Sequence, residues 1–311
     1  FPMCTLKQVS YQNLGWASAA HLYLPSDFDE SKTYPAIVST HPIGSCKEQT
    51  SGSIYARALA DAGFIALAFD ASFQGESGGS PRFIEDPSIR TSDIRFAIDY
   101  FMSLSFVDEN KIGAIGICGG GAYSIHAAIT DHRIKAVASI TGVNFGRLLR
   151  EGFSQFDPVS ALEAIAKQRT AEAKGEQAYI LDYLPNSVED AKTAGISDID
   201  VLEATDYYKT PRGQTSNGKT SGLFSFNGAA LGWDAFLNAE TLLTQPLLVA
   251  VGDKVGGFGA YRDGMEIYGR AASNDKHIIV AEGISHYELY DQPEAVNLEL
   301  SSVIPFFKDR L

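Results

Sequence analysis

The segment from Lys111 to Tyr123 constrains the fold of this chain more than any other feature of the sequence. It reads KIGAIGICGGGAY, so that a strand-like apolar run passes through Cys118 directly into a helical pattern. Gly116 and Gly120 lie two residues to either side of the cysteine, which is the spacing of a nucleophile elbow, a strained turn between a strand and a helix. Side chains at those two positions would clash in such a turn. The segment therefore predicts a nucleophilic cysteine at one edge of a sheet.

Two properties of this turn favour a reactive thiol. The helix that begins at Gly119 points the positive end of its dipole at Cys118, which favours the thiolate. The N–H of Gly119 is also placed to stabilise an oxyanion. Two other interpretations stay open: a buried, inert structural cysteine, and a phosphate-binding turn, although the Gly-Lys-Ser/Thr sequence of such turns does not follow here.

Short apolar runs alternate with helical patterns along most of the chain. This alternation predicts an α/β fold with a mostly parallel sheet and helices on both faces. Two earlier runs, Leu6–Tyr11 and Trp16–Leu24, alternate apolar and polar residues and predict an antiparallel hairpin at the start of the sheet. The buried strands are expected at residues 36–39, 64–69, 112–117, 134–140, 247–251 and 277–281.

The alternation stops between residues 144 and 244. This stretch holds helical patterns and a segment rich in Gly, Thr, Asn and Ser at 210–222. A structureless connection of this size is improbable in a compact domain. We therefore expect residues 144–244 to form an inserted, mostly helical cap, and residues 1–143 and 245–311 to form one core. A loosely packed edge of the same domain is the alternative.

A cysteine nucleophile needs a base and a group that orients the base. Among the six histidines, His286 is best placed, because it follows the last predicted strand in a loop before the final helix. The strand at 247–251 ends in Gly-Asp, which makes Asp253 the first choice for the acid and Asp263 the alternative. A carboxylate there would hold the imidazole tautomer and stabilise the imidazolium. The order cysteine, acid, histidine is typical of nucleophile elbows.

The loop after the strand at 36–39 is expected to complete the oxyanion hole. Pro42 has no N–H, so Ile43 is predicted as the second donor beside Gly119. His41 is expected to brace this loop. Glu48 lies in the same loop and could approach the thiol of Cys118 and tune its ionisation; a helix N-terminal acid is the alternative interpretation.

Four segments of the chain resemble α/β-hydrolases of the dienelactone-hydrolase-like group, including fungal polyketide transferases and thiohydrolases. The resemblance implies an α/β-hydrolase fold, a Cys-Asp-His triad at Cys118, Asp253 and His286, and a contact of Glu48 with the resting thiol. Dienelactone hydrolase itself lacks an insertion of this size, so its lactone specificity is not carried over. The segments are His41-Pro-Ile-Gly with Lys47-Glu-Gln, Phe69-Asp-Ala-Ser-Phe-Gln-Gly-Glu-Ser-Gly-Gly, Gly116-Ile-Cys-Gly-Gly-Gly and Ser285-His-Tyr-Glu-Leu-Tyr-Asp.

These features predict a cysteine-dependent acyl hydrolase that cleaves an ester, thioester or lactone through a covalent acyl-enzyme. An acyltransferase with the same triad is the first alternative, and a non-catalytic binding or redox-responsive protein on this fold is the second. Aromatic residues of the insertion either bind a large apolar acyl group or form its own core, and Arg212 either binds a substrate carboxylate or forms a surface ion pair. The candidate substrate-binding residues are Tyr207, Tyr208, Arg212 and Trp233, with Phe153 and Phe156 nearby.

Composition narrows the partners. The chain has 25 Lys and Arg against 38 Asp and Glu, a net charge of −13, which argues against nucleic acid or an anionic membrane as a partner. No apolar run reaches membrane-spanning length, and no metal or cofactor motif is evident, so a small-molecule acyl substrate is expected; a homodimer is compatible with the sequence. Three cysteines and a required free thiol favour a reducing, cytoplasmic compartment, although a chain beginning at Phe1 leaves export open.

Overall fold

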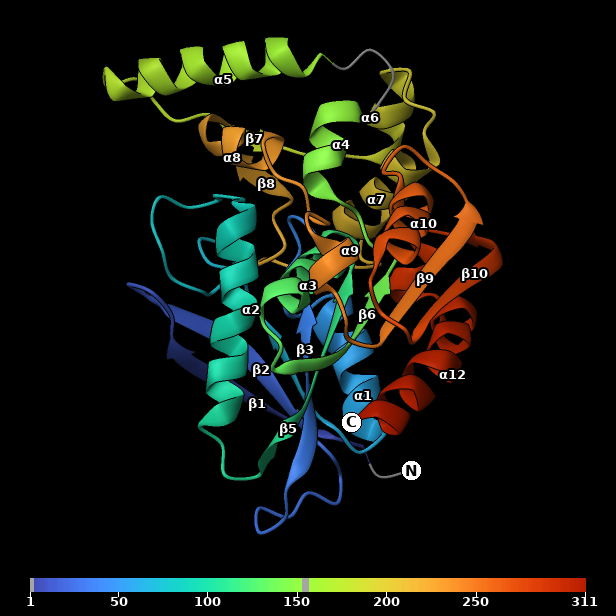
Figure 1. Ribbon diagram of the computed structural model, residues 1–311. Helices are drawn as coiled ribbons and strands as arrows, with labels where there is room; N and C mark the ends of the chain where they lie inside the picture. The colour runs from blue at the N-terminus through green and yellow to red at the C-terminus, as the bar shows by residue number, and fades with distance from the viewer. Residues whose placement is uncertain (1–2, 153–156) are drawn as a thin grey trace.

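The computed structural model describes residues 3–152 and 157–311 and contains an eight-stranded, mostly parallel sheet (Figure 1). The strand order is β1-β2-β4-β3-β5-β6-β9-β10. β1 pairs antiparallel with β2 and β2 pairs antiparallel with β4, and the remaining pairs are parallel. The predicted hairpin and parallel sheet are therefore confirmed. The strands are β1 (Thr5–Gln12), β2 (Ala17–Leu24), β3 (Tyr34–Thr40), β4 (Ile65–Phe69), β5 (Val107–Ile117), β6 (Ile134–Ile140), β9 (Leu247–Lys254) and β10 (Lys276–Ser285).

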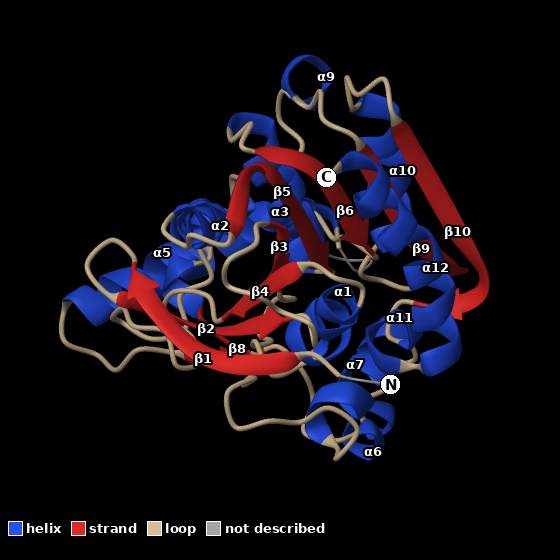
Figure 2. Cartoon of the chain, turned by 90° about the horizontal axis from the view of Figure 1, so that it is seen from below, coloured by secondary structure: helices blue, strands red, loops and turns tan. Residues whose placement is uncertain are grey.

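Helices cover both faces of this sheet, because its central strands are apolar on both sides (Figure 2). Successive residues of β3 show this: Val38 packs into the core beneath α2 and α3, whereas Ile37 packs into the core beneath α1 and α12. A π-helical turn, η1 (Thr50–Ala56), precedes α1. The helices of the core are α1 (Arg57–Asp61), α2 (Pro87–Met102), α3 (Gly119–Thr130), α10 (Ala260–Arg270), α11 (Glu288–Asp291) and α12 (Pro293–Arg310).

Between β6 and β9 the chain leaves the sheet, and most of this segment gathers at one end of the strands (Figure 1). It is mainly helical, as the sequence predicts, but it also contains a two-stranded antiparallel ribbon. Each strand of the ribbon has only three residues, too few for an alternating pattern to be recognised. The elements are α4 (Phe145–Glu151), α5 (Pro158–Ala173), β7 (Ile180–Asp182), α6 (Val188–Thr193), α7 (Ile199–Lys209), β8 (Ser221–Leu223), the 3₁₀ turn η2 (Phe224–Phe226), α8 (Gly228–Leu231) and α9 (Ala239–Leu242).

None of the helices in residues 3–152 and 157–311 has both the length and the apolar character needed to span a bilayer.

Candidate active site

Cys118 occupies the turn between β5 and α3, with backbone angles of φ 56° and ψ −126°. Residues other than glycine rarely adopt this backbone conformation. The neighbouring chain passes too close for side chains at the flanking positions. A β-carbon on Gly116 would lie 1.9 Å from the carbonyl oxygen of Gly120, and one on Gly120 would lie 2.1 Å from the carbonyl oxygen of Thr40. The strained elbow that the glycine spacing predicts is therefore present.

The thiol of Cys118 is protonated at rest. Cys118 is 6% exposed, and this burial raises the pKa of its thiol to about 12. The Tyr290 hydroxyl and the Gly119 N–H lower the pKa of the thiol, but by less than burial raises it. The Tyr290 hydroxyl lies close to the sulfur but outside good hydrogen-bond geometry. The expectation that the helix start favours a thiolate is therefore wrong, because desolvation outweighs the helix dipole.

His286 lies in the loop between β10 and α11, as predicted, and is almost fully buried. Its Nδ1 is 2.7 Å from the hydroxyl of Thr141, and its Nε2 has no hydrogen-bond partner among the described residues. Burial lowers the pKa of the imidazole to about 3, so the ring is neutral. Tyr290 connects the two predicted groups: its ring centroid is 5.4 Å from that of His286, and its hydroxyl lies beside Cys118.

Thr141 was not anticipated from the sequence. It follows β6 directly, at the same edge of the sheet as Cys118, and its backbone is fixed in the left-handed region by an N–H···O bond of 2.7 Å to Ala250. The only sequence signal is a hydroxyl residue at the end of a buried strand, which is too common to single out. Its hydroxyl occupies the position on the imidazole where a carboxylate was expected.

The structure brings neither predicted acid to His286. Asp253 is exposed and accepts the Gly283 N–H at 2.7 Å, because β9 continues to Lys254 instead of ending at Gly252. Asp263 is buried in α10, where it accepts two hydrogen bonds from Arg147 of α4, at 2.9 and 2.8 Å. It also accepts the N–H of Asn144 at 2.8 Å. Its carboxylate therefore joins two helices and does not orient the imidazole.

Ile43, the predicted second oxyanion donor, packs against Gly119, the residue that follows Cys118. Ile43 and Cys118 line the same cavity. A β-carbon built on Gly119 would be 2.6 Å from a side-chain carbon of Ile43 and 3.4 Å from its backbone nitrogen, so the two residues are in contact. His41 braces this loop as expected: its Nδ1 is 2.7 Å from the carbonyl oxygen of Pro42, and its Nε2 accepts the N–H of Ala71 at 3.0 Å.

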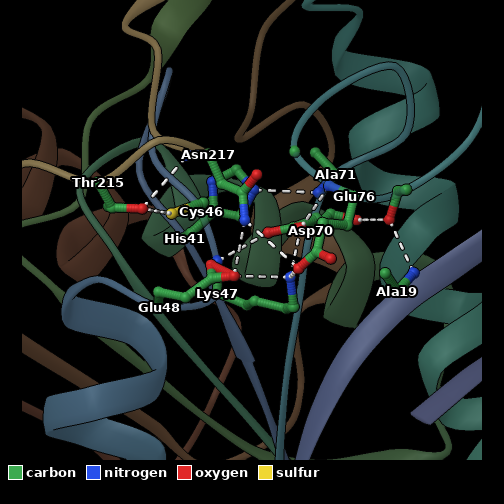
Figure 3. A network of polar contacts seen from close by, with 12 residues as sticks. Ala19, His41, Cys46, Lys47, Glu48, Asp70, Ala71, Glu76, Thr215 and Asn217 are labelled. Carbon is green, nitrogen blue, oxygen red and sulfur yellow. Dashed lines mark hydrogen bonds and ion pairs between the residues drawn. The ribbon is translucent and has the colours of Figure 1, made fainter. Parts of the chain in front are cut away.

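Glu48 lies in a polar network with Cys46 and Lys47 (Figure 3), and it is not among the groups that shift the pKa of the Cys118 thiol. Its Oε1 accepts hydrogen bonds from Lys47 at 2.8 Å and Asn217 at 2.9 Å, and the ammonium of Lys47 also binds Asp70 at 2.8 Å. The predicted thiol-tuning role is therefore wrong, because the charge of Lys47 holds the carboxylate within this network.

The same network contains a group of atoms spaced like the ligands of a metal. One donor atom each of Cys46, Glu48 and Asp70 lie within 4.8 Å of one another. The Nζ of Lys47 binds Glu48 and Asp70 and adds Glu76 at 2.6 Å. The positive charge that these carboxylates require is therefore already supplied by the chain itself.

A cavity of about 220 Å³ opens above Cys118. Among the described residues that line it, none is acidic or basic. Tyr208 lines it, as predicted, whereas Tyr207, Arg212 and Trp233 do not. The lining residues are Ile43, Cys118, Val143, Phe145, Leu148, Leu149, Gly152, Leu181, Tyr183, Leu184, Val201, Tyr208, Thr220, Asn227, Phe258, Tyr287 and Tyr290.

The three predicted substrate-binding residues outside the cavity have structural contacts. Arg212 binds Asp291 at 2.8 Å and Asp206 at 3.0 Å, which is the ion-pair alternative and not a substrate contact. Tyr207 packs on other tyrosines of the site, and Trp233 packs on Tyr123 and His126. Phe153 and Phe156 lie outside the described residues.

The sheet, its helices and the elbow at the end of β5 define an α/β-hydrolase. Comparisons with known proteins agree. The model of the dienelactone hydrolase family matches residues 19–167. The uncharacterized protein YcjY of Escherichia coli strain K12 is 39% identical over 297 residues, which cover 94% of each chain. The crystal structure of hypothetical protein PA2218 from Pseudomonas aeruginosa superposes with a TM-score of 0.89 and 29% identity, covering 100% of this chain and 96% of that one.

A shorter match concerns a relative with a stated activity. A thiohydrolase of Eupenicillium brefeldianum is 30% identical over 112 residues, 35% of this chain and 36% of that protein. The chain belongs to the dienelactone hydrolase family and is a hydrolase.

Proposed function

We propose that this hydrolase cleaves an ester, thioester or lactone of an uncharged, largely apolar acyl group through a covalent intermediate on Cys118. The observation that carries the proposal is the position of the thiol: it lies on a strained elbow, faces an apolar cavity and has the Gly119 N–H beside it, with Ile43 packed against Gly119. A buried structural cysteine would require neither the strain nor the cavity.

The first half of the reaction forms the acyl-enzyme. The Cys118 proton moves to Nε2 of His286 as the sulfur attacks the carbonyl carbon, and the N–H groups of Gly119 and Ile43 stabilise the oxyanion. The bond from the acyl carbon to the leaving oxygen or sulfur then breaks, and the leaving group takes the proton from His286. Because the pKa of the thiol is raised and that of the imidazole is lowered, proton transfer accompanies the attack and does not precede it.

The second half regenerates the enzyme. His286 removes a proton from water, the resulting hydroxide attacks the acyl carbon, and the bond between that carbon and the sulfur breaks. The sulfur recovers its proton from His286, and the carboxylic acid leaves.

We further propose that residues 144–244 act as a cap that shapes the acyl site. Most of the cavity's lining residues belong to this segment, including Leu148, Leu181 and Val201. Burying an ionised substrate group against these side chains would be costly. The Tyr183 hydroxyl and the Asn227 side-chain oxygen are buried and have no partner among the described residues. They are suited to bind a hydroxyl or carbonyl group of the acyl chain.

The test compares turnover of p-nitrophenyl acyl esters and acyl thioesters by the wild type and by Cys118→Ala. We expect the variant to lose at least about 1,000-fold in kcat/KM, and mass spectrometry of the wild type to detect an acyl group on Cys118. Cys4→Ala, which alters a cysteine remote from the cavity lining, should keep full activity. Unchanged turnover by Cys118→Ala would overturn the proposal.

Acyl transfer is the second candidate, and the burial of Cys118 beneath the cap favours it. An alcohol, amine or thiol would then replace water in the second half of the reaction. The product ratio at increasing acceptor concentration distinguishes the two: a rising share of transferred product indicates a transferase, whereas hydrolysis alone at saturating acceptor indicates a hydrolase.

A further inference from the structure

Among the described residues, the imidazole of His286 has one hydrogen-bond partner, and this partner is neutral. The hydroxyl of Thr141 can orient the ring, but it cannot compensate the positive charge that forms when Cys118 gives up its proton. A buried imidazolium without a counter-charge is strongly unfavourable. A carboxylate near the site would remove this cost.

The carboxylate of Asp200, which belongs to another part of the chain, packs against the loop that follows β9. A β-carbon built on Gly256 would lie 2.2 Å from the carboxyl carbon of Asp200, so the carboxyl group fills the space that a side chain at position 256 would take. The N–H of Phe258 donates to Asp200 Oδ2 at 2.9 Å. Asp200 comes from the first turn of α7, in the cap.

Asp200 is 98% buried, at 2% exposure, and its second oxygen has no hydrogen-bond partner in the described part of the chain. Its neighbour Asp198 contacts the same loop but is fully engaged. Asp198 accepts the Gly257 N–H at 2.7 Å with one oxygen and caps α7 through the Val201 N–H at 3.0 Å with the other. A structural role explains Asp198, but it does not explain the unpaired oxygen of Asp200.

Asp200 is also near the reacting groups. Phe258, whose N–H it accepts, packs its ring edge-on against His286 with 5.7 Å between centroids. The charge of Asp200 is close enough to raise the pKa of Cys118 and that of Tyr287. One carboxyl group is therefore in electrostatic contact with the nucleophile and shares a neighbour with the base.

We propose that Asp200 supplies the acid of this site from the cap, as the counter-charge for the His286 imidazolium. The inference rests on the function proposed above. Asp200 acts through His286 and is a positioning residue, since it forms no bond to the substrate. The thiol proton still passes from Cys118 to Nε2 and on to the leaving group, and Asp200 remains ionised throughout.

The protonation of Asp200 then sets the pH dependence. Burial raises the pKa of Asp200 to about 7, and the neighbouring carboxylates of Asp198 and Glu203 add to this. Cys118 and Tyr287, which face it from other elements, are neutral at that pH. Because the ionised form is the active one, kcat/KM should rise as the pH increases through about 7.

The experiment replaces Asp200 by Asn, which keeps an oxygen for the Phe258 N–H but removes the charge. We expect kcat to fall about 30-fold with KM nearly unchanged, and the rise of kcat/KM near pH 7 to disappear. Alkylation of Cys118 by iodoacetamide should shift to lower pH, because the thiol loses a negative neighbour.

Asp200→Glu should recover part of kcat and the pH dependence. Asp198→Asn is the matched control: it should keep wild-type kcat at alkaline pH, while the rise of kcat/KM remains and moves to lower pH because Asp200 loses a negative neighbour.

Full activity and an unchanged pH profile in Asp200→Asn, with Cys118→Ala inactive, would overturn this inference and leave the proposed function standing. Activity in Cys118→Ala would instead overturn the proposed function. Should Asp200→Asn fail to fold, the wild-type profile decides: a rise through about pH 7 supports the inference, and a flat profile from about pH 5 to 9 contradicts it.

Discussion

Burial acts in opposite directions on the two central groups of the site. It raises the pKa of the Cys118 thiol to about 12 and lowers that of the His286 imidazole to about 3. The proton therefore stays on the sulfur, and the resting pair is neutral. A protonated thiol is a weak nucleophile, so we expect Cys118 to react slowly with oxidants and alkylating agents at neutral pH.

At this scale we predict that Thr141→Val lowers kcat by about tenfold and leaves KM and the melting temperature nearly unchanged. Valine keeps the branched shape but removes the hydroxyl that holds Nδ1 of His286 at 2.7 Å, so the imidazole loses its fixed tautomer and orientation. Steady-state kinetics and thermal unfolding measure both effects. Thr141→Ser should retain most of kcat, and a fully active Thr141→Val would show that the hydroxyl has no orienting role.

Among the elements, α4 and α10 are joined by two ion pairs in very different surroundings. The pair of Arg147 with Asp263 is buried, with side chains 7% and 0% exposed. The pair of Arg262 with Glu151 connects the same helices but is exposed. The start of the segment 144–244 is therefore held by a buried carboxylate that has few other partners.

We predict that Arg147→Met lowers the free energy of unfolding by about 3 kcal/mol, because it leaves the Asp263 carboxylate buried without its cation. Urea denaturation measures the change. Arg262→Met is the control and should have little effect, since an exposed pair is screened by water. Equal effects of the two substitutions would contradict the distinction.

The accuracy of the sequence-based predictions varied between elements. Gly116, Gly120 and the apolar run before Cys118 suffice to predict β5, the elbow and α3, because the steric requirement is local. The structure holds Asp253 away from His286, and the apolar run at 247–251 does not reveal this because it does not show that β9 continues to Lys254. Asp200 was not recognised because no spacing rule relates a cap helix to the loop after β9; only the packed fold brings them together.

Considered as a whole molecule, the chain forms an uncharged cavity between the end of its sheet and residues 144–244. The net charge of −13 is carried elsewhere, since none of the described lining residues is acidic or basic. Under the proposed function, this cavity would select substrates by desolvation and shape, and not by ion pairing.

We predict that a p-nitrophenyl ester of a neutral acyl chain is cleaved at least about 100-fold faster, in kcat/KM, than the half-ester of a dicarboxylic acid of the same length. The terminal carboxylate of the half-ester would have to enter the cavity without a counter-ion. Parallel kinetics on the two esters check this. Comparable rates would indicate that the acyl chain does not occupy the cavity.

The placement of Asp200 on α7 has a consequence for protein engineering and for the divergence of such enzymes. The same helix carries Glu203, which holds the Ser285 hydroxyl at 2.6 Å next to His286, and Tyr208, which lines the cavity. A chimaera that receives a foreign 144–244 segment to change its selectivity would lose these groups together. Exchanging the whole segment to change selectivity would therefore also lower turnover. A successful graft must keep α7 while exchanging the elements around it.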